Sequence, residues 1–226
     1  MTRTTNARVA GFTFLFYIAV GLTGMFLENR AASGEGTAAK LASIAQHASE
    51  MRVAYVAVLL SCICALVLAV TLYSITRDQD PDLAMLVLTC RTAEGITGAI
   101  SLQEMQGKLW LATAAGADAP DPAAATALGA VLLKLPGSNV AATFFAVGSL
   151  IFTYLLLRGR IVPVPLAWLG VIASILIVVG LPLDAVGILP GPLPQLMWLP
   201  MLAFEVPLAL WLIIKGAAMP PRRQSA

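Results

Sequence analysis

Three ionisable side chains stand within long apolar stretches of the sequence, where no water is available to solvate a charge. They are Arg91, Glu94 and Glu205. Ionisable groups inside a membrane are costly, and they usually face a partner or a cavity in the protein. One guanidinium between two carboxylates leaves a surplus negative charge when all three groups are ionised. A proton, a cation or a cationic ligand would balance such a site.

The same three residues also fit a purely structural role. Arg91 would then tie its own helix to the last span through Glu94 and Glu205, with one carboxyl group protonated. Buried ion pairs can specify how helices pair without taking part in chemistry. The sequence therefore leaves two alternatives open, a ligand or transport site and a structural charge cluster.

Small and polar side chains recur on the helix face that carries Arg91 and Glu94. They are Gly95, Gly98 and Ser101, which follow at helical spacing. Small residues allow membrane helices to approach closely, so we expect a buried seam between helices. A seam of this kind can also form between two copies of a chain, and a homodimer stays open for that reason.

The remaining candidates for chemistry are weaker. Asp184 stands at the end of a span and is interpreted as a helix-end or loop carboxylate. His47 is the only histidine, without a second histidine for a metal site or a nucleophile for a triad. Cys62, Cys64 and Cys90 are interpreted as small buried apolar residues. We therefore predict no metal site, no cofactor and no assigned catalytic residue. An enzyme acting on lipid or prenyl substrates is disfavoured, although two carboxylates could perform acid and base roles.

The overall composition indicates which kind of element must position these residues. Of the 226 residues, 59% are hydrophobic and 12% are charged, and the mean hydropathy is +0.86. Soluble domains carry roughly 45–50% apolar and about 25% charged residues, so the lipid bilayer is the expected surrounding. The net charge of +2 gives no basic footprint for nucleic acid.

Hydrophobic segment lengths predict the fold. A helix that crosses about 30 Å of hydrocarbon needs roughly 20 apolar residues. Six stretches meet this requirement, at residues 9–27, 53–75, 83–102, 139–157, 161–181 and 193–214. We predict an all-α fold, a polytopic bundle of six transmembrane helices that forms a single domain over residues 1–226.

The distribution of basic residues predicts the orientation in the membrane. Eight Lys and Arg residues fall on the side of the N-terminus and five on the other side. Because cytoplasmic loops carry the excess of basic residues, both termini are predicted to be cytoplasmic. At 1.5 Å per residue, Arg91, Glu94 and Glu205 then lie about 12 to 17 Å from the inner ends of their spans, near the midplane. The inner group comprises Arg3, Arg8, Arg77, Arg158, Arg160, Lys215, Arg222 and Arg223.

Two connections on the predicted outer side are long, at residues 28–52 and 103–138. In the first, apolar residues recur at helical spacing from Leu41 to Met51, which predicts an amphipathic helix leading into the second span. In the second, Asp121 followed by proline is typical of a helix N-cap. These segments are interpreted as a lid over the bundle, or alternatively as a binding surface.

A short inner connection carries alternating acidic residues, Asp78, Asp80 and Asp82. The pattern could indicate a cation site. Asp80 before Pro81 instead predicts an N-cap with proline at the first helical position, and Asp82 falls in the first turn, where the helix dipole favours an anion. Structural capping is the preferred interpretation.

Several segments along nearly the whole chain carry a family resemblance. They are Arg8-Val-Ala-Gly-Phe, the helix from Ala38 to Arg52, Thr71-Leu-Tyr, Arg91-Thr-Ala-Glu, Phe144-Phe through Arg158-Gly, and Phe204-Glu-Val-Pro-Leu-Ala-Leu-Trp-Leu-Ile-Ile-Lys-Gly. Together they resemble domain-of-unknown-function family 4386, a family of bacterial integral membrane proteins. The resemblance implies a six-helix protein of the bacterial inner membrane, and it implies no activity.

These observations favour one function and leave an alternative. The favoured function is the binding or movement of a small molecule, a lipid or an ion at the polar cluster near the midplane. The alternative is an accessory or sensory membrane protein, in which the cluster is structural and the outer segments contact a second membrane protein.

Overall fold

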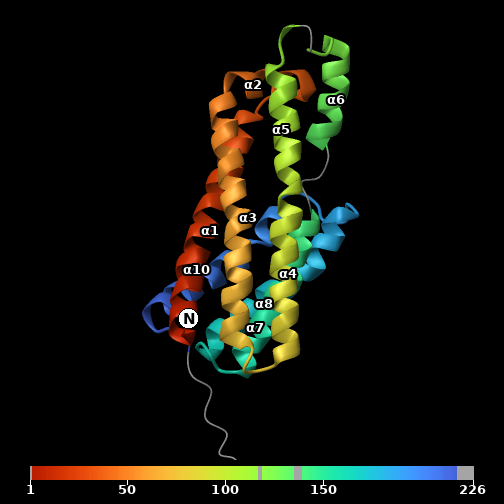
Figure 1. The fold of residues 1–226 in the computed structure, drawn as a ribbon. Coiled ribbons are helices and arrows are strands. Elements are labelled where there is room, and N and C mark those ends of the chain that lie inside the picture. The colour runs from red at the N-terminus through yellow and green to blue at the C-terminus, as the bar shows by residue number, and fades with distance from the viewer. Residues whose placement is uncertain (1, 117–118, 135–138, 218–226) are drawn as a thin grey trace, which may run out of the picture. The chain divides into compact units, whose positions relative to one another are not determined.

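Every regular element of the described chain is a helix. The computed structural model describes residues 2–116, 119–134 and 139–217. In chain order the helices are α1 (Arg3–Ala31), α2 (Gly36–Gln46), α3 (Ala48–Thr76), α4 (Pro81–Gly98), α5 (Ile100–Thr113), α6 (Pro122–Lys134), α7 (Asn139–Arg158), α8 (Val164–Ala185), α9 (Leu193–Leu196) and α10 (Leu199–Ile214) (Figure 1). The predicted all-α fold is confirmed.

Six helical segments of the described residues are long and apolar enough to cross a membrane. They are Arg3–Ala31, Ala48–Thr76, Pro81–Thr113, Val140–Arg158, Val164–Ala185 and Leu193–Ile214. Only 22% to 44% of the residues in their most apolar stretches are buried, so apolar side chains cover most of the surface of these helices. Lipid is the solvent that tolerates such a surface. The protein is a multi-pass membrane protein, as its composition predicts.

The chain forms two compact units. The first comprises the described residues of Met1–Phe16, Cys64–Gly95 and Asn139–Ala226. The second comprises Tyr17–Ile63 and the described residues of Ile96–Ser138. Helices α1, α3 and α4 therefore contribute residues to both units. A single domain over residues 1–226 stays a prediction.

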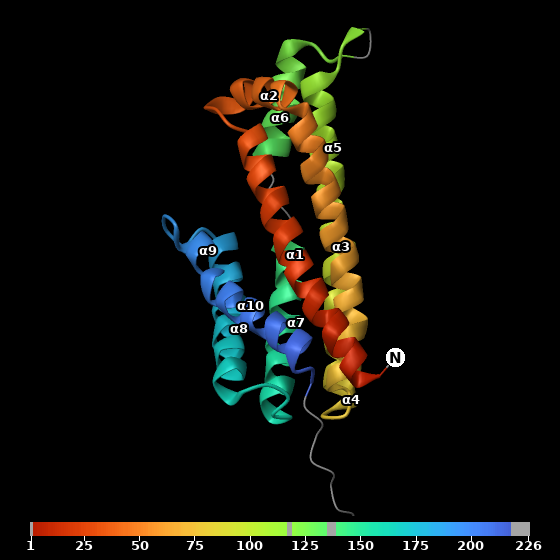
Figure 2. The same cartoon turned by 90° about the vertical axis from the view of Figure 1, so that its left-hand side faces the viewer.

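Glycines allow the helices of the first unit to pack closely. In this unit α8 packs against α7 and α10 (Figure 2). A Cβ atom on Gly170 of α8 would lie 2.6 Å from the Phe204 ring of α10 and 2.7 Å from Thr153 of α7. A Cβ atom on Gly11 of α1 would lie 2.6 Å from the Ala209 carbonyl oxygen of α10. The two glycines therefore bring α1 and α8 against α10, the helix that carries Glu205.

The second unit has its own apolar core. Its buried centre consists of Ala31, Ile44, Met51, Ala54 and Met105. Helix α2 contacts α5 and α6, and it lies across the direction of α3 and α5 (Figure 2). The amphipathic helix expected in the first long connection is therefore present, and its apolar face packs into this core.

The third apolar segment is longer than predicted, and it is interrupted. Helix α4 ends at Gly98, α5 begins at Ile100, and the Ala99 N–H donates to the Ile96 carbonyl at 3.2 Å across the break. The helix then continues to Thr113, whereas the sequence predicts an end at residue 102. Its polar residues do not end the helix, because buried apolar side chains such as Met105 recur among them and pack in the second unit.

A helix break also separates the amphipathic segment from the second span. The sequence predicts one helix running into that span, but α2 ends at Gln46 and α3 begins at Ala48. The Ser43 carbonyl accepts the His47 backbone N–H at 2.9 Å, and the His47 ring Nδ1 also lies 2.9 Å from this oxygen. His47 therefore serves as the cap between two helices.

The two predicted N-caps are confirmed. The Asp80 carboxylate accepts the Leu83 backbone N–H at 3.1 Å, at the start of α4. The Asp121 carboxylate accepts the N–H groups of Ala123 and Ala124, each at 2.9 Å, at the start of α6. Each carboxylate therefore satisfies backbone donors that have no partner within the first turn of a helix.

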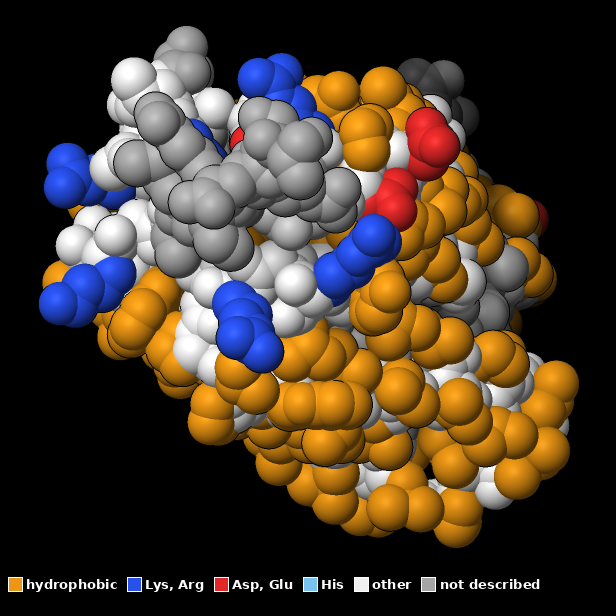
Figure 3. Space-filling model, turned by 90° about the horizontal axis from the view of Figure 1, so that it is seen from below, with side chains coloured by type: hydrophobic (Ala, Val, Ile, Leu, Met, Phe, Trp, Pro, Cys, Tyr) orange, Lys and Arg blue, Asp and Glu red, His pale blue; other side chains and the backbone are white. Residues whose placement is uncertain are grey.

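Basic side chains gather at one end of the first unit, where α1 begins, α3 is joined to α4, α7 is joined to α8, and α10 ends (Figure 3). Two ion pairs cross this end, Arg3 with Asp78 at 3.4 Å and Arg158 with Asp80 at 3.0 Å. Arg222 and Arg223, which the sequence assigns to the same side, lie outside the described residues. The exposed basic residues of this end are Arg8, Arg77, Arg158, Arg160 and Lys215.

Replacing Gly11 by alanine is expected to lower the free energy of unfolding by about 1–3 kcal/mol, the usual cost of overpacking. The added methyl group meets the backbone of α10, which cannot turn aside as a side chain can. Gly21 of the same helix is the matched control, because its nearest neighbour would be the Ser61 hydroxyl oxygen at 4.0 Å. Thermal unfolding in one detergent measures both variants. Equal melting temperatures for Gly11→Ala and Gly21→Ala would contradict the expected contact.

The Asp80 cap is expected to make stability depend on pH in the acid range. The hydrogen bond from the Leu83 N–H, with help from Arg158, holds the pKa of Asp80 below its usual range. Asp80 therefore contributes stability above its unfolded pKa of about 3.9, and this contribution is lost as the pH falls through the lower folded value. Asp80→Asn keeps a capping oxygen without the charge, so its melting temperature should fall less steeply in acid. An unchanged acid profile in this variant would be evidence against the cap.

Candidate functional site

The three intramembrane charges predicted from the sequence meet in the first unit. Arg91 and Glu94 lie on α4 and Glu205 lies on α10, and we call these three residues the charge cluster. Their exposed fractions are 1%, 5% and 6%. They therefore lie away from both lipid and solvent, in a medium where charges interact strongly and an unbalanced charge is costly.

Arg91 binds Glu94 directly. Residues three apart share a helix face, and the Arg91 Nη1 atom donates to the Glu94 carboxylate at 2.9 Å. Both partners are ionised groups at short range, so this is a strong, charge-assisted hydrogen bond. Local helix geometry is sufficient to form this pair.

Glu205 is held more loosely. Its nearest contact to the guanidinium is 3.8 Å, from the Arg91 Nη2 atom to one carboxylate oxygen. Among the described residues, no donor forms a hydrogen bond with the Glu205 carboxylate. Glu205 therefore interacts with the cluster through charge, without the directional bond that Glu94 makes.

Two further side chains of α7 complete the surroundings of Arg91. The Ser149 hydroxyl oxygen accepts a hydrogen bond from the Arg91 Nη2 atom at 3.4 Å. The Phe145 ring centroid lies 4.6 Å from the guanidinium carbon, and the Phe14 ring of α1 lies 5.8 Å from it. Both distances fall within the range of cation–π attraction, which strengthens when the cation is desolvated.

The aromatic contact extends to α10 as well. Phe145 packs against Trp198, which precedes α10, with ring centroids 5.7 Å apart. Arg91 is therefore in contact with α1, α4, α7 and α10 of the described chain, through aromatic, hydroxyl and carboxylate groups.

Helix α10 contains a proline near Glu205. Pro207 lies inside this helix. A proline has no N–H, so the Ala203 carbonyl loses the helical hydrogen bond that residue 207 would otherwise donate. Ala203 and Pro207 are exposed whereas Glu205 is buried, so this carbonyl and the carboxylate lie on different sides of the helix.

The weaker candidates take other roles. The Ser101 hydroxyl donates to the Gly98 carbonyl at 2.6 Å, at the break between α4 and α5. Asp184 lies in the last turn of α8, its carbonyl accepts the Gly187 N–H at 2.9 Å, and its carboxylate forms no ion pair within the described part of the chain. His47 caps α2 in the second unit. These contacts belong to helix ends, and a role of the three residues in binding stays a prediction.

Sequence reasoning missed the α7 and α1 partners of Arg91. Phe145 and Ser149 are four residues apart, so they share a helix face. A serine one turn from an aromatic residue in an apolar span was the available signal for α7. Phe14 gave no signal, because phenylalanine is ordinary in a membrane helix.

Comparison with known proteins assigns the chain to a family. The family model described as "Domain of unknown function (DUF4386)" matches residues 9–216. The chain belongs to this family. The matched range includes the charge cluster and its aromatic neighbours, so the site lies within the part that defines the DUF4386 family. No curated protein and no solved structure matches the chain.

Removing the positive charge of the cluster is expected to destabilise the protein strongly. Arg91→Met leaves two carboxylates buried without their cation, at a cost of about 3–5 kcal/mol. Neutralising both acids in the same chain, with Glu94→Gln and Glu205→Gln, should restore much of this loss. Thermal unfolding in detergent measures all variants.

The exposed pair of Arg158 and Asp80 gives the matched control. The Arg158 side chain is 46% exposed, so Arg158→Gln should cost about 1 kcal/mol or less. The expectation would be contradicted if the Arg91→Met protein were as stable as wild type, or if the triple variant recovered no stability. Either result would show that the charge interactions of the cluster contribute little to the free energy of unfolding.

Proposed function

We propose that the protein binds or moves a small cation, a proton or a monovalent metal ion, at Glu205 in the charge cluster. The observation that carries this proposal is the surplus carboxylate. Two buried acids share one guanidinium, and Glu205, at 3.8 Å, forms no hydrogen bond with the described residues.

Charge balance supports the proposal. Arg91 satisfies Glu94 with a direct hydrogen bond at 2.9 Å, which leaves the charge of Glu205 only partly compensated. An unpaired charge buried at this depth raises the free energy of the folded protein, and a bound cation or proton lowers it again. The ligand therefore has a positive charge and small size.

The proposal includes a placement in the cell. We place the protein in the inner membrane of a bacterium, with both termini in the cytoplasm. The basic residues at the end of the first unit support this orientation, since positive charge accumulates on the cytoplasmic side (Figure 3).

A second candidate is an accessory or sensory membrane protein with a structural cluster. The contacts of Arg91 favour this candidate. The side chain is 1% exposed and is surrounded by two aromatic rings, a serine and two acids. Such contacts can hold helices together without a ligand. The two candidates differ in one measurable respect, which is the response of the folded protein to cations.

The test compares Glu205→Gln with wild type in the same detergent. Glutamine keeps the size of the side chain and removes its charge. We expect the wild-type melting temperature to change with the identity of the monovalent cation at constant ionic strength, or with pH, and the variant to lose this dependence. A ligand at about 100 times its Kd stabilises the folded state by about 2.7 kcal/mol.

Glu35→Gln is the matched control, because it removes an exposed carboxylate in the second unit. It should retain the full cation or pH response. Identical responses of wild type and Glu205→Gln would reject cation binding and favour the structural cluster. A loss shared by Glu35→Gln would show that the response comes from surface charge.

A further inference from the structure

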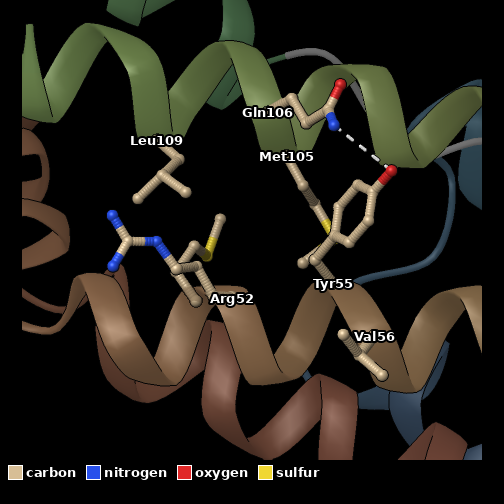
Figure 4. A pocket seen from close by; sticks show the side chains of 7 residues that line it. Arg52, Tyr55, Val56, Met105, Gln106 and Leu109 are labelled. Carbon is tan, nitrogen blue, oxygen red and sulfur yellow. Dashed lines mark hydrogen bonds between the residues drawn. The ribbon is translucent and has the colours of Figure 1, made fainter.

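A cavity of about 220 Å³ lies in the second unit. It is enclosed by the first turns of α3 and by the facing part of α5 (Figure 4). Small-molecule pockets usually measure about 300–1,000 Å³, so this space accepts only part of a larger ligand. We call it the α3–α5 groove.

The groove has an apolar floor and a polar edge. Met51 and Met105, which belong to the buried core, form the floor, and Leu109 and Val56 provide the accessible aliphatic surface. The Gln106 amide donates to the Tyr55 hydroxyl at 3.2 Å across the groove (Figure 4). A hydroxyl keeps its own proton for donation when it accepts a hydrogen bond, so Tyr55 can still donate to a ligand oxygen.

Arg52 at this edge lacks an acidic partner. Two other cations of the second unit are paired, Arg30 with Glu50 at 3.4 Å and Lys108 with Glu28 at 3.0 Å, whereas Lys40 of α2 forms no ion pair among the described residues and does not line the groove. Within the described residues, Arg52 forms no ion pair, and its side chain is exposed. A positive charge beside an apolar groove, without an acid of the described chain beside it, is complementary to an anionic group joined to an apolar chain.

The order of these groups along α3 follows the order of groups in a phospholipid. Arg52 lies in the second turn of the helix, and Tyr55 lies about 4.5 Å further along its axis. Beyond Tyr55, Val56, Leu59 and Ile63 form a stripe at helical spacing, with exposed fractions of 50%, 40% and 49%. Along α3 a cation is therefore followed by a hydroxyl group and then by exposed apolar side chains, which matches the phosphate, ester and acyl chain of a phospholipid.

An aromatic residue of α5 indicates that this level is a membrane interface. Trp110 follows Leu109 of the groove and is 51% exposed. Tryptophan and tyrosine concentrate where the headgroups meet the hydrocarbon. Trp110 and Tyr55 together place the edge of the groove at headgroup depth.

We propose that the α3–α5 groove binds one anionic phospholipid from the surrounding bilayer. The phosphate pairs with Arg52, an ester oxygen accepts a hydrogen bond from the Tyr55 hydroxyl, and the upper part of one acyl chain lies against Leu109 and Val56. The remainder of the chain follows the apolar stripe that begins at Val56. Arginine suits the phosphate because its planar guanidinium can donate two parallel hydrogen bonds.

The test uses the full chain in nanodiscs that contain equal amounts of phosphatidylglycerol and phosphatidylcholine with the same acyl chains. Native mass spectrometry then counts the lipids that stay bound when the protein is released. We expect wild type to retain phosphatidylglycerol in preference. Arg52→Gln should weaken this retention about tenfold, the effect of losing one hydrogen bond to a charged group.

Matched variants separate the groove from general electrostatics. Arg30→Gln removes an exposed arginine of the same unit, and it should leave the preference unchanged. Arg52→Lys should keep part of it. Val56→Trp fills the start of the apolar track at an exposed position, where the fold tolerates a larger side chain, and it should lower retention of the lipid.

Three results would overturn the proposal. They are equal retention of the two lipids by wild type, an unchanged preference in Arg52→Gln, and an equal loss in Arg30→Gln. Dissolved glycerol phosphate provides the final arm. Displacement of the lipid by this soluble anion at matched concentration would show that the groove recognises a free phosphate group, without an acyl chain.

Discussion

The structure of the first unit depends on one constraint, the need to satisfy an arginine where there is no water. A guanidinium carries five N–H donors and a permanent charge, and the hydrocarbon core of a bilayer contains no hydrogen-bond acceptor or counter-charge for it. Arg91 therefore draws its partners from the protein, a carboxylate on its own helix, a hydroxyl and a ring on α7, a ring on α1 and a second carboxylate on α10. Each partner fixes the position of the helix that carries it.

The close packing around α10 is the geometric counterpart of this electrostatic requirement. Glu205 reaches the guanidinium only if α10 lies near α1 and α4. Gly11 and Gly170 allow neighbouring helices to approach α10 at distances that a methyl group would prevent. In lipid the hydrophobic effect contributes little to helix association, so close van der Waals packing and polar contacts must provide the attraction.

Three groups of basic residues in the described chain have different surroundings. Arg91 is enclosed and shares its charge with two acids. Arg3, Arg30 and Arg158 form ion pairs at the ends of helices, and Lys108 forms one with Glu28 from within α5. Arg52 is exposed beside an apolar groove and has no acidic partner in the described chain. The first group concerns the inside of the bundle, and the last concerns its lipid boundary.

The sequence by itself determined the all-α membrane fold and its six apolar segments, because lipid permits only one pattern of composition and length for a spanning helix. It also determined the caps at Asp80 and Asp121 and the pairing of Arg91 with Glu94, since these depend on residues within one helical turn. Only the tertiary structure decided the break at Ala99, the extension of α5 to Thr113, and the contacts of Arg91 with Phe14, Phe145 and Ser149. The physical reason is range. Periodicity and capping act between neighbours in sequence, whereas these features depend on which helices meet, and apolar residues in membrane spans look alike whether they face lipid or protein.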